Sequence, residues 1–198
     1  MDNKKVKGYA YGVIASVSYG LNPLFALPLY ASGIRVDSVL FYRYVFAVLI
    51  LGILMKVQGQ SFALKRNEIL PVAVMGLLFS FSSLFLFQSF NYMDAGIAST
   101  ILFMYPVLVA VIMAVFFKER LSVVKIASIA TAFVGISMLY KGEGGATLSM
   151  TGVCLVLMSS LTYALYIVGV NRSSLKEMPG LKLTFYAILF GSLVYIVR

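Results

Sequence analysis

The sequence predicts an all-α integral membrane protein, a multi-helix bundle of about seven transmembrane helices. Its 198 residues are 61% hydrophobic and 12% charged, with a mean hydropathy of +0.96. A soluble domain is nearer roughly half apolar and a quarter charged. The apolar residues also fall into segments of about 20, the length that spans the bilayer core as a helix. Short joints between these segments indicate that consecutive helices pack as antiparallel neighbours.

Each expected span is bounded by charge or by a turn. The first begins after Lys7, because no charged residue occurs between it and Arg35. The second is interrupted only by Arg43, the fifth carries Lys125 at its edge, and the seventh is still apolar at Arg198. Backbone amides in lipid must bond within their own segment, so we expect every span to be a helix. The spans are Gly8–Tyr30, Asp37–Met55, Ile69–Tyr92, Ala95–Phe117, Ser122–Tyr140, Thr147–Val170 and a last one from Leu181 onward.

The basic residues follow the positive-inside pattern. The formal net charge is +9, yet the Lys and Arg residues lie in short loops between apolar runs, so we expect no nucleic-acid partner. Twelve of them fall on one side of the predicted membrane and three on the other. This asymmetry predicts a multi-pass protein of the cell (plasma or inner) membrane with its N-terminus in the cytoplasm.

Composition also argues against enzymatic catalysis and metal binding. The chain has no histidine, which removes the commonest general base and metal ligand, and its one cysteine, Cys154, lies within an apolar run. No acidic residue lies deep in a span, and no glycine-rich loop of the Walker type occurs. We therefore predict no catalytic residue, no metal, no cofactor and no enzyme activity.

The sequence matches itself weakly at an offset of 144 residues. Eight identities arise, among them Tyr19 with Tyr163, Phe41 with Phe185 and Tyr42 with Tyr186. Five spans separate the two first helices, and because five is odd, the second copy would enter the membrane upside down. Such inverted-topology repeats are typical of transporters.

The repeat predicts two domains. Residues 1–142 would be a first five-helix repeat and residues 143–198 the start of a second, inverted and incomplete one. Judged from the first copy, a complete second copy needs about ninety further residues, so we expect three helices to be missing.

The stretch Ala95–Leu121, with the aspartate before it, carries the motifs Asp-Ala-Gly-Ile-Ala-Ser-Thr, Met-Tyr-Pro-Val and Phe-Phe-Lys-Glu-Arg-Leu, and a later helix contains Phe-Val-Gly-Ile. The chain thereby resembles the EamA-type permeases of the drug/metabolite transporter superfamily, with Arg43, Pro106 and Glu119 where that pattern has them. The resemblance implies a ten-helix carrier of two inverted repeats, which moves amino acids, other metabolites or drugs by alternating access. One departure is Ala187 at the counterpart of Arg43.

Polar and aromatic residues within the spans are the candidate substrate site. Arg43 is a charge inside a span, about 9 Å from its outer end by helix rise. Ser16, Tyr19 and Asn22 share one helix face, and prolines break the first and fourth spans. The full set is Ser16, Tyr19, Asn22, Arg43, Gln88, Tyr92, Tyr105, Pro106, Tyr163 and Tyr166.

Each candidate has an ordinary structural alternative. Arg43 could extend its side chain to the outer interface, the prolines could only kink helices for packing, and most tyrosines could be interfacial residues. We expect Gly76, Ser80, Ser83 and Gly135 to be close helix-packing positions, and Asp94 to be a helix N-cap.

The expected function is that of a secondary transporter of small metabolites. Its expected partners are the lipid bilayer and a small-molecule substrate, with a homodimer as an open alternative. Two rivals remain: a non-transporting membrane subunit or inactive fragment that needs a partner, and an intramembrane enzyme, which the composition disfavours.

Overall fold

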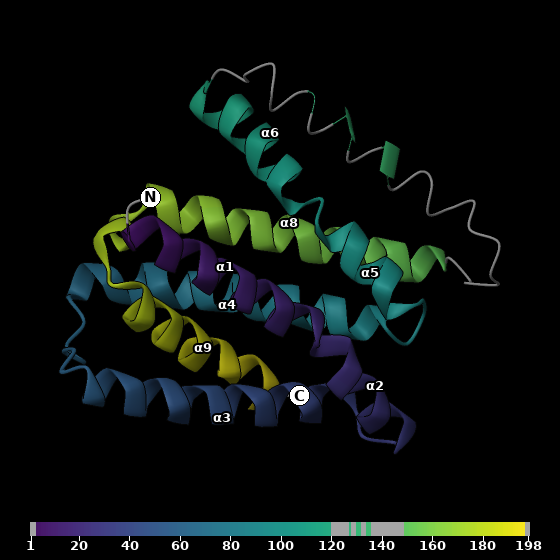
Figure 1. The fold of residues 1–198 in the computed structure, drawn as a ribbon, viewed down its shortest axis with the longest axis horizontal. Coiled ribbons are helices and arrows are strands. Elements are labelled where there is room, and N and C mark those ends of the chain that lie inside the picture. The colour runs from purple at the N-terminus through teal and green to yellow at the C-terminus, as the bar shows by residue number, and fades with distance from the viewer. Residues whose placement is uncertain (1–2, 120–126, 128–129, 132–133, 136–148, 197–198) are drawn as a thin grey trace. The chain divides into compact units, whose positions relative to one another are not determined.

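The computed structural model describes residues 3–119, 127, 130–131, 134–135 and 149–196 (Figure 1). Every regular element of these residues is a helix, which confirms the predicted all-α fold class. Within these described ranges, five helical segments are long and apolar enough to cross a membrane, and a further apolar helix, α9, is shorter. The expected span Ser122–Tyr140 lies outside the described residues, apart from a few isolated positions. The chain divides into two compact units, Met1–Arg35 and Val36–Arg198, which are described in turn.

The first unit is one membrane-spanning segment made of two helices. These are α1, Asn3–Gly20, and α2, Asn22–Ala31, with Leu21 between them. Pro23 lies in the first turn of α2, where its missing N–H costs nothing, so the helix restarts there. The sequence predicted a single span here, and Gly8–Ala31 is indeed long and apolar enough to be one.

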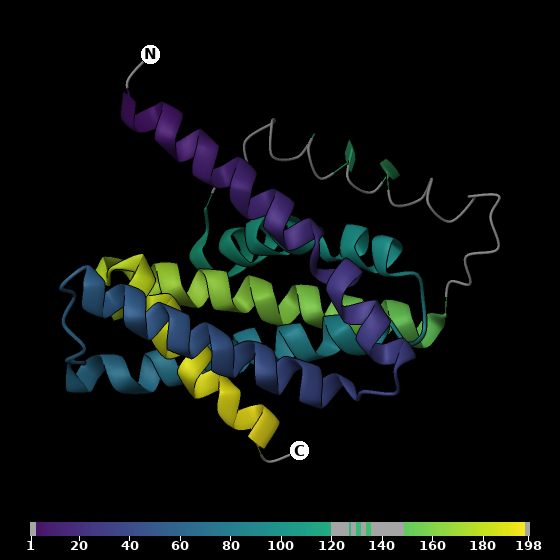
Figure 2. The ribbon, with the colours of Figure 1, turned by 60° about the horizontal axis from the view of Figure 1, so that its bottom comes forward.

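The second unit is a bundle built around one central helix, α4. This helix packs against α8 and α9 and also contacts α3 and α5, while α5 and α6 pack on α8 (Figures 1 and 2). α4 and α9 run in one direction, and α3, α5, α6 and α8 run in the other, so α4 is antiparallel to α8 and α3 is antiparallel to both α4 and α9 (Figure 1). The elements are α3 Val36–Val57, α4 Arg66–Ser89, α5 Ala95–Leu102, α6 Tyr105–Phe117, α8 Met150–Arg172, the 3-10 helix η1 Ser174–Glu177 and α9 Gly180–Ile196.

The fourth predicted span is broken in its middle. It begins as predicted at the N-cap Asp94, whose carboxylate accepts from the backbone N–H groups of Gly96 at 2.8 Å and Ile97 at 3.1 Å. The α5 helix then stops at Leu102 and α6 restarts at Tyr105. Pro106, in the first turn of α6, cannot donate a hydrogen bond back into α5, so the two halves take separate axes.

The crossing of α4 and α9 depends on small residues. A Cβ added to Gly76 of α4 would lie 2.6 Å from the backbone oxygen of Ala187 in α9. A Cβ added to Gly191, one turn after Ala187, would overlap the hydroxyl oxygen of Ser80 and would lie 2.9 Å from the backbone oxygen of Gly76. Gly76 and Ser80 are thus close packing positions, as predicted, and the two backbones touch without side chains between them.

A reciprocal pair of serines joins α4 to α8. The Ser82 hydroxyl donates to the backbone oxygen of Ser159 at 3.0 Å, and the Ser159 hydroxyl donates to that of Ser82 at 2.7 Å. Both side chains are buried. In an apolar surrounding these hydroxyls have no water to bond, so the pair fixes the two helices in one register.

We expect Ser82→Ala and Ser159→Ala to be coupled. Either change leaves one hydroxyl of the pair with a single remaining partner, so a double-mutant cycle should give a coupling free energy of about 0.6–1.7 kcal/mol. The measurement is unfolding in mixed micelles by denaturant. The control combines Ser16→Ala with Ser82→Ala or with Ser159→Ala and should show no coupling, because the Ser16 hydroxyl bonds to Gly12 one turn earlier in its own helix. Additive effects of Ser82→Ala and Ser159→Ala would contradict the interpretation.

The loop between α3 and α4 is held by the start of α9. Lys182 donates to the backbone oxygen of Ala63, and the Tyr186 hydroxyl donates to that of Phe62. The rings of Phe62 and Phe185 also meet edge to face, with centroids 5.7 Å apart. These contacts tie α9 to a loop more than a hundred residues earlier in the chain.

Candidate functional site

Four aromatic rings from three helices meet in the second unit. We call Phe79, Tyr105, Tyr163 and Tyr166 the aromatic cluster. The Tyr105 and Tyr163 centroids are 4.8 Å apart in an edge-to-face pair, and Tyr163 and Tyr166 stack at 5.9 Å. Phe79 lies 5.4 Å from Tyr166 and 6.2 Å from Tyr163. The structure therefore brings together three of the ten predicted site residues.

Local geometry explains why these rings meet. Tyr163 and Tyr166 are three residues apart on α8, so they share one face of that helix. Tyr105 is the first residue of α6, and the break before it directs α6 along an axis of its own. Phe79 comes from the central helix α4. The proline that follows Tyr105 thus helps to set the position of the ring.

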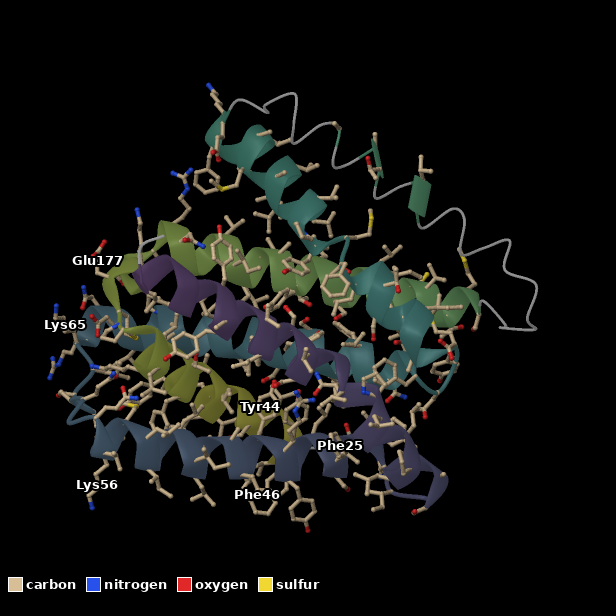
Figure 3. The ribbon with its side chains drawn as sticks, viewed as in Figure 1. Phe25, Tyr44, Phe46, Lys56, Lys65 and Glu177 are labelled. Atoms are coloured by element: carbon tan, nitrogen blue, oxygen red, sulfur yellow. The ribbon has the colours of Figure 1, made fainter. Side chains whose placement is uncertain are left out.

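The cluster continues into the core through two buried tyrosines. Phe79 lies 6.3 Å from Tyr44 of α3, which meets Tyr195 of α9 edge to face at 4.8 Å. Their hydroxyls are both bound, Tyr44 donating to the Ser83 hydroxyl at 3.0 Å and Tyr195 to the Ser80 backbone oxygen at 2.7 Å. Figure 3 shows Tyr44 directed into the bundle and Phe46 directed away from it.

Burial divides this aromatic series into two parts. Tyr44 and Tyr195 are each 4% exposed, and their hydroxyls already have partners. The four rings of the aromatic cluster are only half-buried. Tyr44 and Tyr195 therefore fix the positions of the helices, whereas the rings of the aromatic cluster are only partly covered.

Arg43 lies over a ring rather than beside an anion. Its guanidinium carbon is 5.1 Å from the centroid of the Phe87 ring, in α4, and the Arg43 side chain is exposed whereas Phe87 is buried. Such a cation–π contact contributes about 0.5–1 kcal/mol at an exposed site. A guanidinium that lies over a ring can in general still bind a carboxylate or phosphate through its planar donors.

The other predicted residues lie apart from the aromatic cluster or in the other unit. Gln88 is half-buried in the last turn of α4, Tyr92 is exposed beyond that turn, and Pro106 is exposed beside Tyr105. In the first unit, the exposed Ser16 donates to the Gly12 backbone oxygen at 2.9 Å, Tyr19 is also exposed, and Asn22 begins α2. The structure does not place these three relative to the cluster.

The sequence missed Phe79, Tyr44 and Tyr195. In the sequence these three residues are distinguished only as aromatic residues of the helices α3, α4 and α9. Many other residues of these helices are also aromatic, so the sequence could not select them. As to metals, no group of three His, Cys, Asp or Glu side chains lies together in the part of the chain that the structure describes.

Comparison with known proteins identifies the family. Residues 6–141 match the model of the EamA-like transporter family, which is more than half of the chain. The chain belongs to this family. The resemblance inferred from the motifs around Pro106 is thereby confirmed, as is a multi-pass membrane protein embedded in the lipid bilayer. Membership of a transporter family is also consistent with the prediction that this EamA-family chain is not an enzyme.

Three curated relatives are named as uncharacterized transporters. YxxF of Bacillus subtilis is 28% identical over 132 residues, which cover 64% of this chain and 42% of the relative. One from Archaeoglobus fulgidus is 28% identical over 102 residues (52% and 36%), and YvbV of Bacillus subtilis is 29% identical over 104 residues (52% and 34%). The matched part thus spans about two fifths or less of each relative. No solved structure matches this chain significantly.

Proposed function

We propose that this EamA-family chain is part of a secondary transporter that moves a small metabolite past the aromatic cluster by alternating access. The observation that carries the proposal is the cluster itself, four half-buried rings contributed by α4, α6 and α8. Rings that belong to different helices change their spacing when those helices move, so a ligand bound between them is sensitive to the conformation of the bundle. The relatives are named as transporters, which supports the same activity.

The inverted repeat is part of this proposal, with residues 1–142 as the first copy and 143–198 as the start of the second. The second helix of the first copy would be α3 and that of the second copy would be α9. These two helices run in opposite directions and pack on each other (Figure 1). The matched residues support the repeat, because Phe41 and Tyr42 form an edge-to-face pair at 5.5 Å and Phe185 and Tyr186 form one at 4.9 Å. Halves that pack in this way can exchange conformations, which is the basis of alternating access.

The distribution of charge supports a cytoplasmic N-terminus in the inner or plasma membrane. One end of the second unit carries the basic residues that follow or precede its helices, and Figure 3 shows Lys56, Lys65 and Glu177 there together. That end has seven Lys or Arg side chains against three Glu among the described residues. The residues are Lys56, Lys65, Arg66, Lys118, Arg172, Lys176 and Lys182.

The cluster suits small organic substrates such as amino acids or drugs. Aromatic faces bind apolar groups and organic cations, and tyrosine hydroxyls supply hydrogen bonds at the ring edges. Arg43, nearer the opposite end of the bundle, would attract a substrate carboxylate. Each of these groups alone would bind the substrate weakly. Weak binding is appropriate in a transporter, because the substrate must also be released.

The test is counterflow in proteoliposomes. The purified 198-residue chain is reconstituted into vesicles loaded with an unlabelled cell metabolite extract. Isotope-labelled extract is then added outside, and mass spectrometry identifies which labelled metabolites enter the vesicles. The proposal predicts accumulation of a small set of metabolites above protein-free vesicles and above vesicles with Tyr163→Ala. Equal uptake in all three vesicle types would instead favour a subunit that needs a partner.

We expect Arg43→Ala to change substrate flux while membrane insertion is retained. The substitution removes the charge within α3 and its contact with Phe87 but leaves the apolar length of the helix unchanged. The measurement is the initial flux of the metabolite identified above, at several concentrations. Arg43→Lys is the matched control that keeps the charge without the planar fork, and unaltered kinetics in Arg43→Ala would reduce Arg43 to a structural role.

A further inference from the structure

A pair of cations lies where α6 and α8 end, beyond the aromatic cluster on both helices. Arg172 is the last residue of α8, and its guanidinium carbon is 4.4 Å from the centroid of the ring of Phe117, the last residue of α6. Lys118 follows Phe117 directly. Both cationic side chains are exposed. The Phe117 ring therefore holds the Arg172 guanidinium close to the end of α6, next to a second positive charge.

The backbone at Lys118 is unusual for a lysine. Its φ of 54° is left-handed, and it is the one residue other than glycine with a positive φ in the part of the chain that the structure describes. The turn is closed by the N–H of the next residue, Glu119, which donates to the backbone oxygen of Met113 at 3.2 Å. Glycine or asparagine ordinarily takes this conformation at the end of a helix, and strained backbone often accompanies binding sites.

Apolar side chains flank this cation pair on α6. Val115 is 66% exposed and Phe116 is 76% exposed, so in a membrane both face hydrocarbon. Lys118 and Arg172 come directly after these apolar ends, which puts them at the level of the phospholipid phosphates. A soluble anion would meet only the two cations, whereas a phospholipid would meet the cations and the apolar flank together.

We propose that Lys118 and Arg172 bind the phosphate of an anionic phospholipid, whose acyl chains lie along Val115 and Phe116. The guanidinium offers a planar pair of donors to two phosphate oxygens, and the lysine adds a point charge. Glu119, next in the chain, offsets only part of this positive charge. Because the two cations belong to different helices, the bound lipid would join α6 to α8 at this end. This proposal does not depend on the proposed transport activity.

The test is lipid binding by the full chain in detergent, measured by native mass spectrometry and by thermal unfolding. Phosphatidylglycerol should bind at lower concentration than phosphatidylcholine and should raise the unfolding temperature more. The double variant Lys118→Gln/Arg172→Gln should weaken phosphatidylglycerol binding by about tenfold or more, with phosphatidylcholine binding unchanged. Arg172→Lys should keep most of the affinity, and Phe117→Leu should lose part of it.

The matched control removes two charges at the same end of the bundle but on other helices. Lys56→Gln/Lys65→Gln should keep the wild-type preference for phosphatidylglycerol, since Lys56 belongs to α3 and Lys65 caps α4. Equal losses in the two double variants would show general surface charge and would overturn the site. So would equal binding of the two lipids, or the same stabilisation by inorganic phosphate. If Lys118→Gln/Arg172→Gln does not fold, Lys118→Gln alone serves, because glutamine leaves the apolar flank in place.

Discussion

Tyr163→Ala is expected to insert and assemble but to lose about tenfold or more of its substrate flux. Tyr163 is the ring that contacts all three other members of the aromatic cluster. Aromatic pairs contribute about 0.5–1.5 kcal/mol each beyond the area that they bury, and about 1.4 kcal/mol is a factor of ten in an equilibrium constant. The measurement is initial flux in proteoliposomes, normalised to the protein inserted.

Two controls make this result specific. Tyr163→Phe keeps the ring contacts and should keep most of the flux, with a loss only if the substrate bonds to the hydroxyl. Leu157→Ala changes a residue of the same helix that is 43% exposed and should leave flux close to wild type. Wild-type flux in Tyr163→Ala would remove the cluster from the substrate path.

Gly76→Leu is expected to destabilise the bundle by about 3 kcal/mol, or to prevent its assembly. A Cβ at this position meets the backbone of Ala187, which cannot rotate away as a side chain could. The helices α4 and α9 must therefore separate, and the buried hydrogen bond from Tyr195 to Ser80 is lengthened with them. Denaturant unfolding in mixed micelles measures the loss.

Gly12→Leu is the matched control for this prediction. It makes the same change in α1, where an added Cβ meets nothing within 4 Å, so its stability should stay near that of the wild type. Gly76→Ala should fall between the two. A stable Gly76→Leu protein with wild-type unfolding would show that α4 and α9 are not closely packed in the membrane.

The sequence predicted the helices well because lipid imposes a length on them. The boundaries of α3, α4 and α8 lie within about a turn of the predicted spans, since charges and turns such as the N-cap Asp94 mark where apolar segments end. A break in the fourth span at Pro106 was predicted, with a simple kink as the alternative. The sequence did not decide between them, because whether a proline only bends a helix or divides it depends on neighbouring helices.

The candidate site was predicted only in part, for a related reason. In a soluble helix the polar stripe shows which face is buried, but in lipid both faces are apolar. Nothing in the sequence of α4 separates the inward Phe79 from the exposed Phe81. Tyr105, Tyr163 and Tyr166 were found because a proline or the repeat singled them out, whereas Tyr44 and Tyr195 had no such marker. The partner of Arg43, a ring near the end of another helix, has no signal at all in the sequence.

The loop between α3 and α4 has a consequence for biosynthesis. Its partners Lys182 and Tyr186 lie 119 and 124 residues later than Ala63 and Phe62. At roughly 5–20 residues per second, translation of that interval takes on the order of ten seconds. The α3–α4 hairpin thus enters the membrane long before α9 exists, and its loop carbonyls bond to water or to lipid headgroups meanwhile. Final assembly of this bundle is therefore a late event, and a nascent chain halted before α9 would expose the hairpin to membrane quality-control proteases.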